Sequence, residues 1–376
     1  MRETDILIIG GGIAGAGAAY FLSSHARVTL VEAEAQAGYH TTGRSAAFYA
    51  ETYGGPKLQP LTTASKPFFV APPEGYTDVP LVGPRGEIQL FREDERTVAL
   101  KAFADKQAAL PAVRMIDRDE VLALAPFLDG SRFAGAIYDP ECRDLDVAAL
   151  HQGYLRGLRK AGGDILLDAG VESLRREGGR WIATTRAGEI AAPVIVNAAG
   201  AWADKVAAMA GLAPLGIMPL RRTIVTIENP GLEGFRRAAP VTMDIGENWY
   251  FKPEGEGFLL SPADETPSEP CDAQPEMEDV ALAIDSFEKA VGASVSKLRS
   301  KWAGLRSFAP DRAPVIGFDP RAEGFFWSAG QGGFGIQTSP AWSATAACLL
   351  RGVPLPDAFV AAGVDPEVYA PARLIP

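Results

Sequence analysis

Histidine and cysteine are scarce in this chain of 376 residues, which contains three of each. Cys142, Cys271 and Cys348 lie far apart and form no CxxC pair. This spacing argues against a structural zinc site and against a disulfide framework. Three histidines also argue against a multi-histidine metal centre, so we expect no metal. The same composition is typical of a reducing, cytoplasmic compartment, where we expect the protein to be.

Basic residues are outnumbered by acidic ones. Lys and Arg total 36, Asp and Glu total 47, and the formal net charge is −11. An acidic chain of this kind is a poor ligand for phosphate backbones and anionic lipid headgroups. We therefore expect no nucleic acid and no anionic membrane surface as the main partner.

One long stretch lacks Asp, Glu, Lys and Arg, namely residues 6–26. Its length would suffice to span a bilayer. However, it contains the run Gly10–Gly12, and glycine is unfavourable in a helix interior. The residues before it carry more negative than positive charge, whereas a signal peptide begins positive. We therefore expect no transmembrane segment and no signal peptide here. Peripheral docking at the inner membrane, to reach a quinone, stays open.

The glycines in this stretch form a dinucleotide-binding pattern. Gly10-x-Gly12-x-x-Gly15 follows an apolar strand and opens a helix of small residues. The first glycine allows a tight turn, the second lets a pyrophosphate approach the backbone, and the third lets helix and strand pack closely. The helix start adds free N–H groups and partial positive charge for phosphates. Glu32 ends the next strand, about 20 residues on, where a carboxylate binds ribose hydroxyls and disfavours NADP.

Three further segments distinguish FAD from NAD. Residues 38–45 offer hydroxyl groups and the Arg44 guanidinium to phosphate oxygens. Residues 196–200 form a second strand-to-glycine turn, and residues 330–335 precede the last long helix, whose start can face an anion. An extended FAD uses all of these elements, whereas NAD needs fewer, so we expect FAD. The candidate cofactor-binding residues are Gly10, Gly12, Ile13, Ala14, Gly15, Glu32, Ala33, Thr42, Gly43, Arg44, Ser45, Ala46, Val171, Ala199, Gly200, Trp202, Gly332, Gly333, Phe334, Gly335, Ile336 and Gln337.

Several longer stretches carry a resemblance to a known family. They are GYHTTGRSAA from Gly38, LHQGYLRG from Leu150, VNAAGAW from Val196, WAGLRSF from Trp302, and EGFFW through QGGFGIQTS from Glu323. With these stretches the chain resembles the D-amino-acid oxidase/glycine oxidase superfamily of FAD proteins, and within it the FAD-dependent D-arginine dehydrogenases. The resemblance extends over nearly the whole chain.

The resemblance implies a chemistry. The family oxidises the Cα–N bond of D-amino acids by hydride transfer to flavin N5, and the imino acid then hydrolyses to a 2-oxo acid and ammonia. It also implies a flavin domain fused to a substrate domain, with the site between them. Some relatives attach the flavin through a cysteine in the segment around Leu305, where this chain has none. We therefore expect non-covalent FAD.

The chain length and the pattern of predicted helices and strands together predict two domains, because 376 residues are more than a single-domain protein usually has. Strands alternate with helices around the cofactor motifs, whereas short strands separated by turns follow residue 216. We therefore expect an α/β fold, with a Rossmann-type FAD-binding domain plus an α+β substrate domain that has a mostly antiparallel sheet, interleaved in sequence. Residues 1–80, 146–215 and 320–376 are assigned to the FAD-binding domain, and residues 81–145 and 216–319 to the substrate-binding domain.

The resemblance also implies the substrate-binding residues. Ligands of the substrate carboxylate fall on Tyr53, Arg222, Tyr250 and Arg306. The acidic residue that selects the substrate side chain falls on Glu87, which implies a preference for D-Arg and D-Lys.

Phe48 is a departure from the family, which has a histidine at this position. The substitution removes a polar group beside the substrate amine and could favour a secondary amine or a more apolar substrate.

Strand geometry bears on the arginines independently of the resemblance. Arg221 and Arg222 are adjacent in a predicted strand, so their side chains point to opposite faces and only one can enter the site. Arginine pairs with a buried carboxylate through two parallel hydrogen bonds. The resemblance selects Arg222 for this role and leaves Arg221 as the solvated neighbour.

The electron acceptor and the alternative functions are the last questions that the sequence addresses. Several oxidases of the superfamily place a lysine beside the flavin, at a position that falls near Leu259 here. The leucine favours a dehydrogenase that passes electrons to an unidentified carrier, such as a quinone. A glycine-, sarcosine- or N-methyl-amino-acid oxidase that uses O₂ is the main alternative. A tRNA-binding flavoprotein fits poorly with the acidic charge. A redox-inert FAD-binding assembly factor would be indicated if no amine bleached the flavin.

Overall fold

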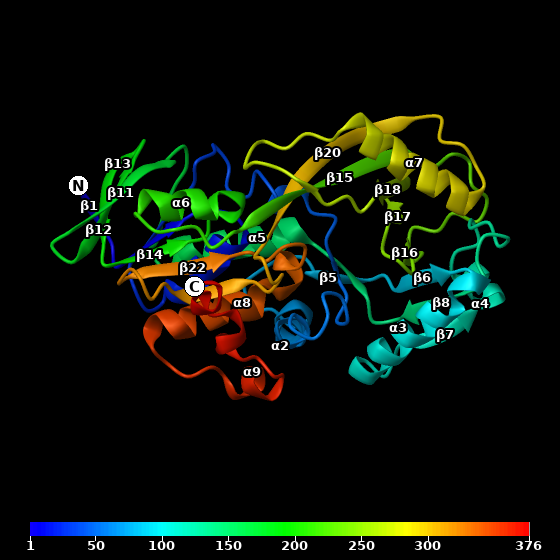
Figure 1. Cartoon of the computed structure of the whole chain (residues 1–376), viewed down its shortest axis with the longest axis horizontal. Coiled ribbons are helices and arrows are strands. Elements are labelled where there is room, and N and C mark those ends of the chain that lie inside the picture. Colours follow the sequence, from blue (N-terminus) through cyan, green and yellow to red (C-terminus); the bar gives the residue numbers. More distant parts are fainter. Residues whose placement is uncertain (376) are drawn as a thin grey trace.

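The computed structural model describes residues 1–375 as two lobes side by side (Figure 1). A six-stranded sheet lies at the centre of the first lobe, in the order β10-β3-β2-β14-β22-β21. Its strands pair in parallel except for β21, which is antiparallel to β22. The strands are β2 (Ile6–Ile9), β3 (Val28–Val31), β10 (Asp164–Leu166), β14 (Val194–Asn197), β21 (Val315–Phe318) and β22 (Phe325–Ala329).

Both faces of this sheet are buried, because its strands are apolar on both sides. Ile8 and Leu30 face a core shared with helices α1 (Ile13–Leu22), α2 (Gln59–Val70), α5 (Val147–Lys160) and α8 (Gly335–Arg351). Leu7 and Ile195 face the other core, under a four-stranded sheet and α6 (Ala203–Met209). That sheet consists of β1 (Arg2–Glu3), β13 (Gly188–Ala192), β12 (Arg180–Thr185) and β11 (Val171–Glu177).

The second lobe contains a nine-stranded sheet. Among the strand pairs that residues 1–375 form there, β6 with β16 is parallel and the others are antiparallel. The two longest strands, β15 and β20, extend side by side from the first lobe into the second (Figure 1). The strands are β6 (Glu87–Phe91), β7 (Arg114–Asp117), β8 (Gly135–Asp139), β15 (Met218–Glu228), β16 (Val241–Asp244), β17 (Tyr250–Glu254), β18 (Gly257–Ser261), β19 (Thr266–Pro267) and β20 (Leu298–Phe308).

One face of the nine-stranded sheet is an apolar core. Val225, Phe251 and Phe258 pack there with Phe287 of α7 and Val121 of α4. The helices of this lobe are α3 (Arg96–Ala109), α4 (Arg118–Leu124) and α7 (Met277–Val291). The opposite face carries the charged residues described below.

Small elements complete the chain. A three-stranded sheet, β4-β9-β5, lies between the lobes. Its strands are β4 (Phe48–Tyr49), β5 (Val82–Pro84) and β9 (Arg143–Leu145). The remaining helices are α9 (Asp357–Ala361) and the 3₁₀ turns Thr42–Arg44, Glu93–Glu95, Gly200–Trp202, Pro366–Tyr369 and Pro371–Leu374.

The expected fold class is confirmed, since an α/β sheet and a mostly antiparallel sheet alternate along the chain. The domain boundaries stay predictions. Near the predicted boundary at residues 319 and 320, β21 pairs into the six-stranded sheet, although its residues were assigned to the substrate-binding domain. Helices α2 and α3 were not expected from the sequence. Of the helices in residues 1–375, none is long and apolar enough to cross a membrane.

Candidate active site

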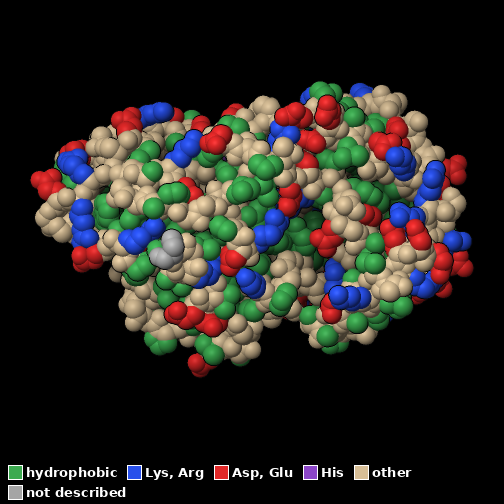
Figure 2. All heavy atoms as spheres, in the orientation of Figure 1, with side chains coloured by type: hydrophobic (Ala, Val, Ile, Leu, Met, Phe, Trp, Pro, Cys, Tyr) green, Lys and Arg blue, Asp and Glu red, His purple; other side chains and the backbone are tan. Residues whose placement is uncertain are grey.

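A cavity of about 400 Å³ lies along the carboxyl ends of β2, β3 and β14. This edge of a doubly wound sheet is where such folds bind nucleotides. The cavity continues past the start of α1 to β15, β17 and β20, where Arg222, Tyr250 and Arg306 line it. On the surface, the molecule is hollowed where its two lobes meet (Figure 2).

The three glycines of the N-terminal motif have different roles. Gly10 has a φ of +108°, and a Cβ there would lie 2.4 Å from the carbonyl oxygen of Ala198. A Cβ on Gly15 would lie 1.9 Å from the Gly10 oxygen, so this residue is needed for packing of α1 on β2. A Cβ on Gly12 would meet Thr42 Oγ1 at 3.3 Å and otherwise point to open space. Gly10 and Gly15 are therefore required by the fold, and Gly12 keeps the cavity open.

The start of α1 offers backbone donors to the cavity. Among the described residues, Gly12 at the N-cap has no side-chain capping bond, and Ile13 N donates to Thr42 Oγ1 at 2.9 Å. Glu32 stands opposite, where its carboxylate accepts from Gly11 N at 2.8 Å and Glu34 N at 3.0 Å. This set of donors and one carboxylate fits the phosphates and ribose of a dinucleotide.

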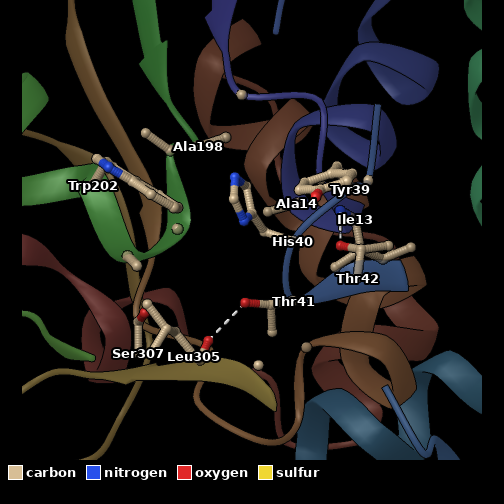
Figure 3. Close-up of a pocket in the computed structure, with 18 of the residues that line it drawn as sticks. Ile13, Ala14, Tyr39, His40, Thr41, Thr42, Ala198, Trp202, Leu305 and Ser307 are labelled. Carbon is tan, nitrogen blue, oxygen red and sulfur yellow. Dashed lines mark hydrogen bonds between the residues drawn. The ribbon is translucent and has the colours of Figure 1, made fainter. Parts of the chain in front are cut away.

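His40 and Trp202 project into the same cavity (Figure 3). The His40 ring lies 4.7 Å from the Trp202 ring, and its Nε2 lies 2.9 Å from Glu34 Oε1. His151 is different, because its Nε2 lies 2.8 Å from the Gly11 oxygen behind the glycine turn. Burial lowers the pKa of His151, so it supports the turn as a neutral ring.

Most of the predicted cofactor residues line this cavity. Four do not: Gly15 and Gly43 are turn or packing residues, Phe334 packs on Tyr53, and Gln337 lines a smaller cavity next to it. Several other lining residues lie outside the predicted cofactor segments and are unremarkable in type. They include Ala169, Lys205, Met209, Leu305 and Ser307, whereas Tyr39, His40, Thr41, Ala198 and Gln331 fall within the predicted segments.

The smaller cavity, about 30 Å³, adjoins the first and is the candidate substrate site. Phe48, Tyr53, Tyr250 and Arg306 line it, with Ile336 and Gln337 of α8 opposite. The Phe48 ring lies 6.0 Å from Tyr53 and 6.3 Å from Tyr250, so the aromatic side chains form a compact wall.

Strand register brings the predicted substrate ligands to one face of the nine-stranded sheet. Arg306 of β20 pairs with Leu220 of β15, so these two side chains point to the same face. Arg222 lies two residues after Leu220 on β15 and therefore points to that face too. The pairings of β15 with β18 and of β18 with β17 place Tyr250 on that face too. Arg221 points to the other side, where it binds Glu276 at 2.5 Å and Asp279 at 3.1 Å. The site thus receives Arg222 rather than Arg221.

The two arginines form an electropositive pair. Arg222 Nε donates to the Asp264 carbonyl oxygen at 2.8 Å, and Arg222 Nη2 lies 3.5 Å from Glu265 Oε1. Within residues 1–375, Arg306 Nη1 donates to the Tyr53 hydroxyl at 3.3 Å and has no carboxylate partner. Burial, and then the charge of Arg306, lower the pKa of Arg222. Such a like-charged pair is an anion-binding arrangement.

Arg306 is also tied to the cofactor cavity through the backbone beside it. Thr41 Oγ1 donates to the Leu305 carbonyl oxygen at 2.7 Å (Figure 3). Gly332 N donates to the Ser307 carbonyl oxygen at 2.8 Å. The two residues that flank Arg306 are therefore bonded to two segments that line the cofactor cavity.

Glu87 lies on the same sheet face, beyond the two cavities. Glu87 is 2% exposed, and its Oε1 lies 3.3 Å from Nζ of Lys106 on α3. Asp139 pairs with Glu87 across β6 and β8, so two carboxylates stand directly opposite each other. Burial, and then the charge of Glu87, raise the pKa of Asp139 to about 6. Asp139 Oδ1 accepts from Glu141 N, whereas Oδ2 has no partner in the described part of the chain.

Comparison with known proteins gives the class of the protein. Residues 5–349 match the family of FAD dependent oxidoreductases, abbreviated DAO, so the chain belongs to this family. Its cofactor is accordingly FAD, in agreement with the fit of the large cavity. The match leaves open the residues that select a substrate.

Individual proteins of known function or structure are similar to this chain. The glycine oxidase of Bacillus licheniformis is 25% identical over 370 residues, which cover 96% of each chain. The mitochondrial dimethylglycine dehydrogenase of Rattus norvegicus is 28% identical over 267 residues, which are 69% of this chain but 31% of that longer protein. The crystal structure of glycine oxidase from Geobacillus kaustophilus has a TM-score of 0.83 at 22% identity, and it covers 94% of this chain and 96% of that chain. The structural likeness shows the fold alone.

The glycine assignment predicts opposite outcomes for two similar substitutions. Gly12→Ala should keep the thermal stability of the FAD-free protein but lower its affinity for FAD at least tenfold, because the methyl group enters the cavity. Gly15→Ala should destabilise the FAD-free protein by about 1–3 kcal/mol, because the methyl group overlaps a backbone oxygen. Thermal unfolding and quenching of FAD fluorescence distinguish them. Equal melting of both variants would contradict the assignment.

The raised pKa of Asp139 predicts a pH-dependent stability. A carboxyl group with a raised folded pKa contributes stability at low pH that is lost as the pH rises through about 6. Asp139→Asn keeps the neutral form at every pH, so it should stabilise the protein at about pH 8 by up to about 3 kcal/mol and change little at about pH 4. Urea unfolding across this range measures the difference. Asp78→Asn, on the surface, is the control, and a pH-independent effect at Asp139 would refute the prediction.

Proposed function

We propose that this protein is an FAD-dependent D-amino acid dehydrogenase, which oxidises the Cα–N bond and releases an imino acid that hydrolyses to a 2-oxo acid and ammonia. The observation that carries the proposal is the pair Arg222 and Arg306 on one sheet face, next to the FAD cavity. Two partly uncompensated guanidinium groups fit a carboxylate, and a neighbouring amine would then lie among the aromatic side chains.

The chain's own residues would act by positioning. Arg306, held by Tyr53, and Arg222, held by the Asp264 carbonyl oxygen, would fix the substrate carboxylate. Phe48 and Tyr250 would exclude water around Cα, which strengthens the electrostatic contacts inside the site. Bound FAD supplies a two-electron acceptor for the hydrogen that leaves Cα. Because the clamp orients Cα, no side chain is needed as an essential base once the amine is neutral.

A second candidate is an oxidase of glycine, sarcosine or another N-methyl amine. Two observations support it: the substrate cavity is small and walled by Phe48, and the relatives include a glycine oxidase and the sarcosine oxidase subunit beta of Rhizobium meliloti, which is 26% identical over 363 residues. The preference for D-amino acids, and for D-Arg and D-Lys among them, stays a prediction. The same is true of a carrier, rather than O₂, as electron acceptor.

Flavin bleaching tests the proposed reaction. The purified yellow protein is mixed without air with D- and L-amino acids, glycine and sarcosine, and the visible flavin absorption is followed. We expect rapid bleaching by D-amino acids and slow recovery when air is admitted. Bleaching confined to glycine or sarcosine, with fast recovery, would establish the second candidate instead. An unbleached flavin with every amine would refute both.

The carboxylate clamp predicts a difference between adjacent arginines. Arg306→Lys should raise KM roughly 100-fold, because a paired charge-assisted hydrogen bond of about 2–3 kcal/mol is lost. Arg222→Lys should act in the same direction. Arg221→Lys is the matched control on the opposite face and should keep KM within about twofold. Steady-state kinetics with an artificial acceptor measures all three, and similar KM values in Arg306→Lys and Arg221→Lys would contradict the clamp.

A further inference from the structure

The charged face of the nine-stranded sheet continues beyond the candidate substrate site. From Tyr250 on β17 it passes Met243 on β16 and reaches Glu87 and Gln89 on β6. Two strand spacings, roughly 10 Å, separate β17 from β6. Between them lies an apolar cluster that includes Met243 and Tyr250, with Phe48 and Tyr53 at its edge. A long substrate side chain that leaves the clamp in this direction would approach Glu87.

Glu87 is not free in this chain. Lys106 extends from α3 to the same face and forms an ion pair with it, and the two side chains are 14% and 3% exposed, respectively. Helix α3 packs Ala102 and Phe103 against a small apolar cluster that includes Ile137 of β8, and Lys106 is its charged contact with this face. A charge that is removed from water in this way requires a partner.

The surroundings of Lys106 are strongly acidic. Asp139 stands opposite Glu87, and Glu247 accepts from Gln89 Nε2 at 3.4 Å. Lys106 is thus one cation among three carboxylates, and one carboxylate oxygen of Asp139, a residue 2% exposed, has no partner within residues 1–375. Burial lowers the pKa of Lys106, but Glu87 and Glu247 outweigh that effect and raise it, so the ammonium stays charged. The group is therefore a cation-binding arrangement whose cation comes from the protein itself.

We propose that Lys106 is a specificity-determining residue, which occupies with its own ammonium group the place that a cationic substrate side chain would take at Glu87. The inference rests on the proposed function and deepens it. Lys106 competes with the side chains of D-Arg and D-Lys for the same carboxylate and leaves neutral side chains unaffected. The unmodified chain is therefore expected to discriminate against cationic substrates, which reverses the preference for D-Arg and D-Lys that Glu87 alone implies.

A matched pair of substrates isolates the charge. D-Lysine and D-norleucine have the same four-carbon side chain and differ in the terminal ammonium group. Lys106→Met removes the internal cation and keeps an unbranched side chain of similar length. Lys101→Met, on the exposed side of the same helix, is the control. The measured quantity is the ratio of flavin-reduction efficiency, kred/Kd, for D-lysine over D-norleucine in anaerobic stopped flow with the FAD-loaded protein.

We expect Lys106→Met to raise this ratio at least ~10-fold, because Glu87 then forms a charge-assisted pair with the substrate. Lys101→Met should leave the ratio unchanged. The gain should disappear in the double variant Lys106→Met/Glu87→Gln, which a merely structural role of Lys106 would not require. If Lys106→Met loses FAD, Lys106→Gln, which keeps a hydrogen bond to Glu87, is used in the same comparison.

The outcomes separate the inference from the function on which it rests. If D-norleucine reduces the flavin in all variants and the ratio stays at the wild-type value in both Lys106 variants, the competition is refuted and the proposed function stands. If neither substrate reduces the flavin in the wild-type protein, the proposed function fails and the inference fails with it. A gain that persists in the double variant would show that Glu87 is not the partner, and would equally overturn the proposal.

Discussion

The placement of Arg222 and Arg306 on one face of the nine-stranded sheet is the constraint on which the proposed site depends. Alternation of side chains along paired strands puts both guanidinium groups on one face of the nine-stranded sheet. Arg222 has one long ion pair, with Glu265 at 3.5 Å, besides its bond to the Asp264 carbonyl oxygen, and Arg306 bonds the Tyr53 hydroxyl and has no carboxylate partner in the described chain. An anion between them would offset the two positive charges, and we propose the α-carboxylate of an amino acid as that anion.

The apolar core on the other side of the nine-stranded sheet stabilises the second lobe, so the face with the arginines can carry charged residues. The other face of the same strands packs Val225, Phe251 and Phe258 against α7, so the sheet is stabilised from one side and the charged side is available for binding. The same division explains Glu87 and Lys106, which compensate each other at the far end of the face. The face opposite the apolar core thus carries both the proposed clamp and the proposed specificity residues, with an apolar cluster between them.

The cofactor half was more predictable from sequence than the substrate half. The glycine motif, Glu32 and the later glycine turns are local signals, because each depends on backbone geometry within a few residues, and most of them line the cavity. Lys106 is not a local signal: it is one lysine in an exposed helix, and its partner lies on a strand that the chain reaches earlier. Similarly, Lys205 and Met209 line the cavity through tertiary packing, which no local sequence pattern indicates. The identity of the substrate ligands came from resemblance, while strand alternation could show only that one of Arg221 and Arg222 enters the site.

The backbone bonds on either side of Arg306 have a consequence for motion. Leu305 is bonded to Thr41, and Ser307 to Gly332, so the clamp and the cofactor cavity belong to one hydrogen-bonded frame that bridges the two lobes. Lobes joined in this way cannot separate like a hinge without breaking that frame. We therefore expect the substrate to enter by movement of the short segment around Tyr53, which is followed by two glycines with positive φ, and not by opening of the molecule as a whole. These bonds thereby fix how far Arg306 lies from the segments that line the cofactor cavity.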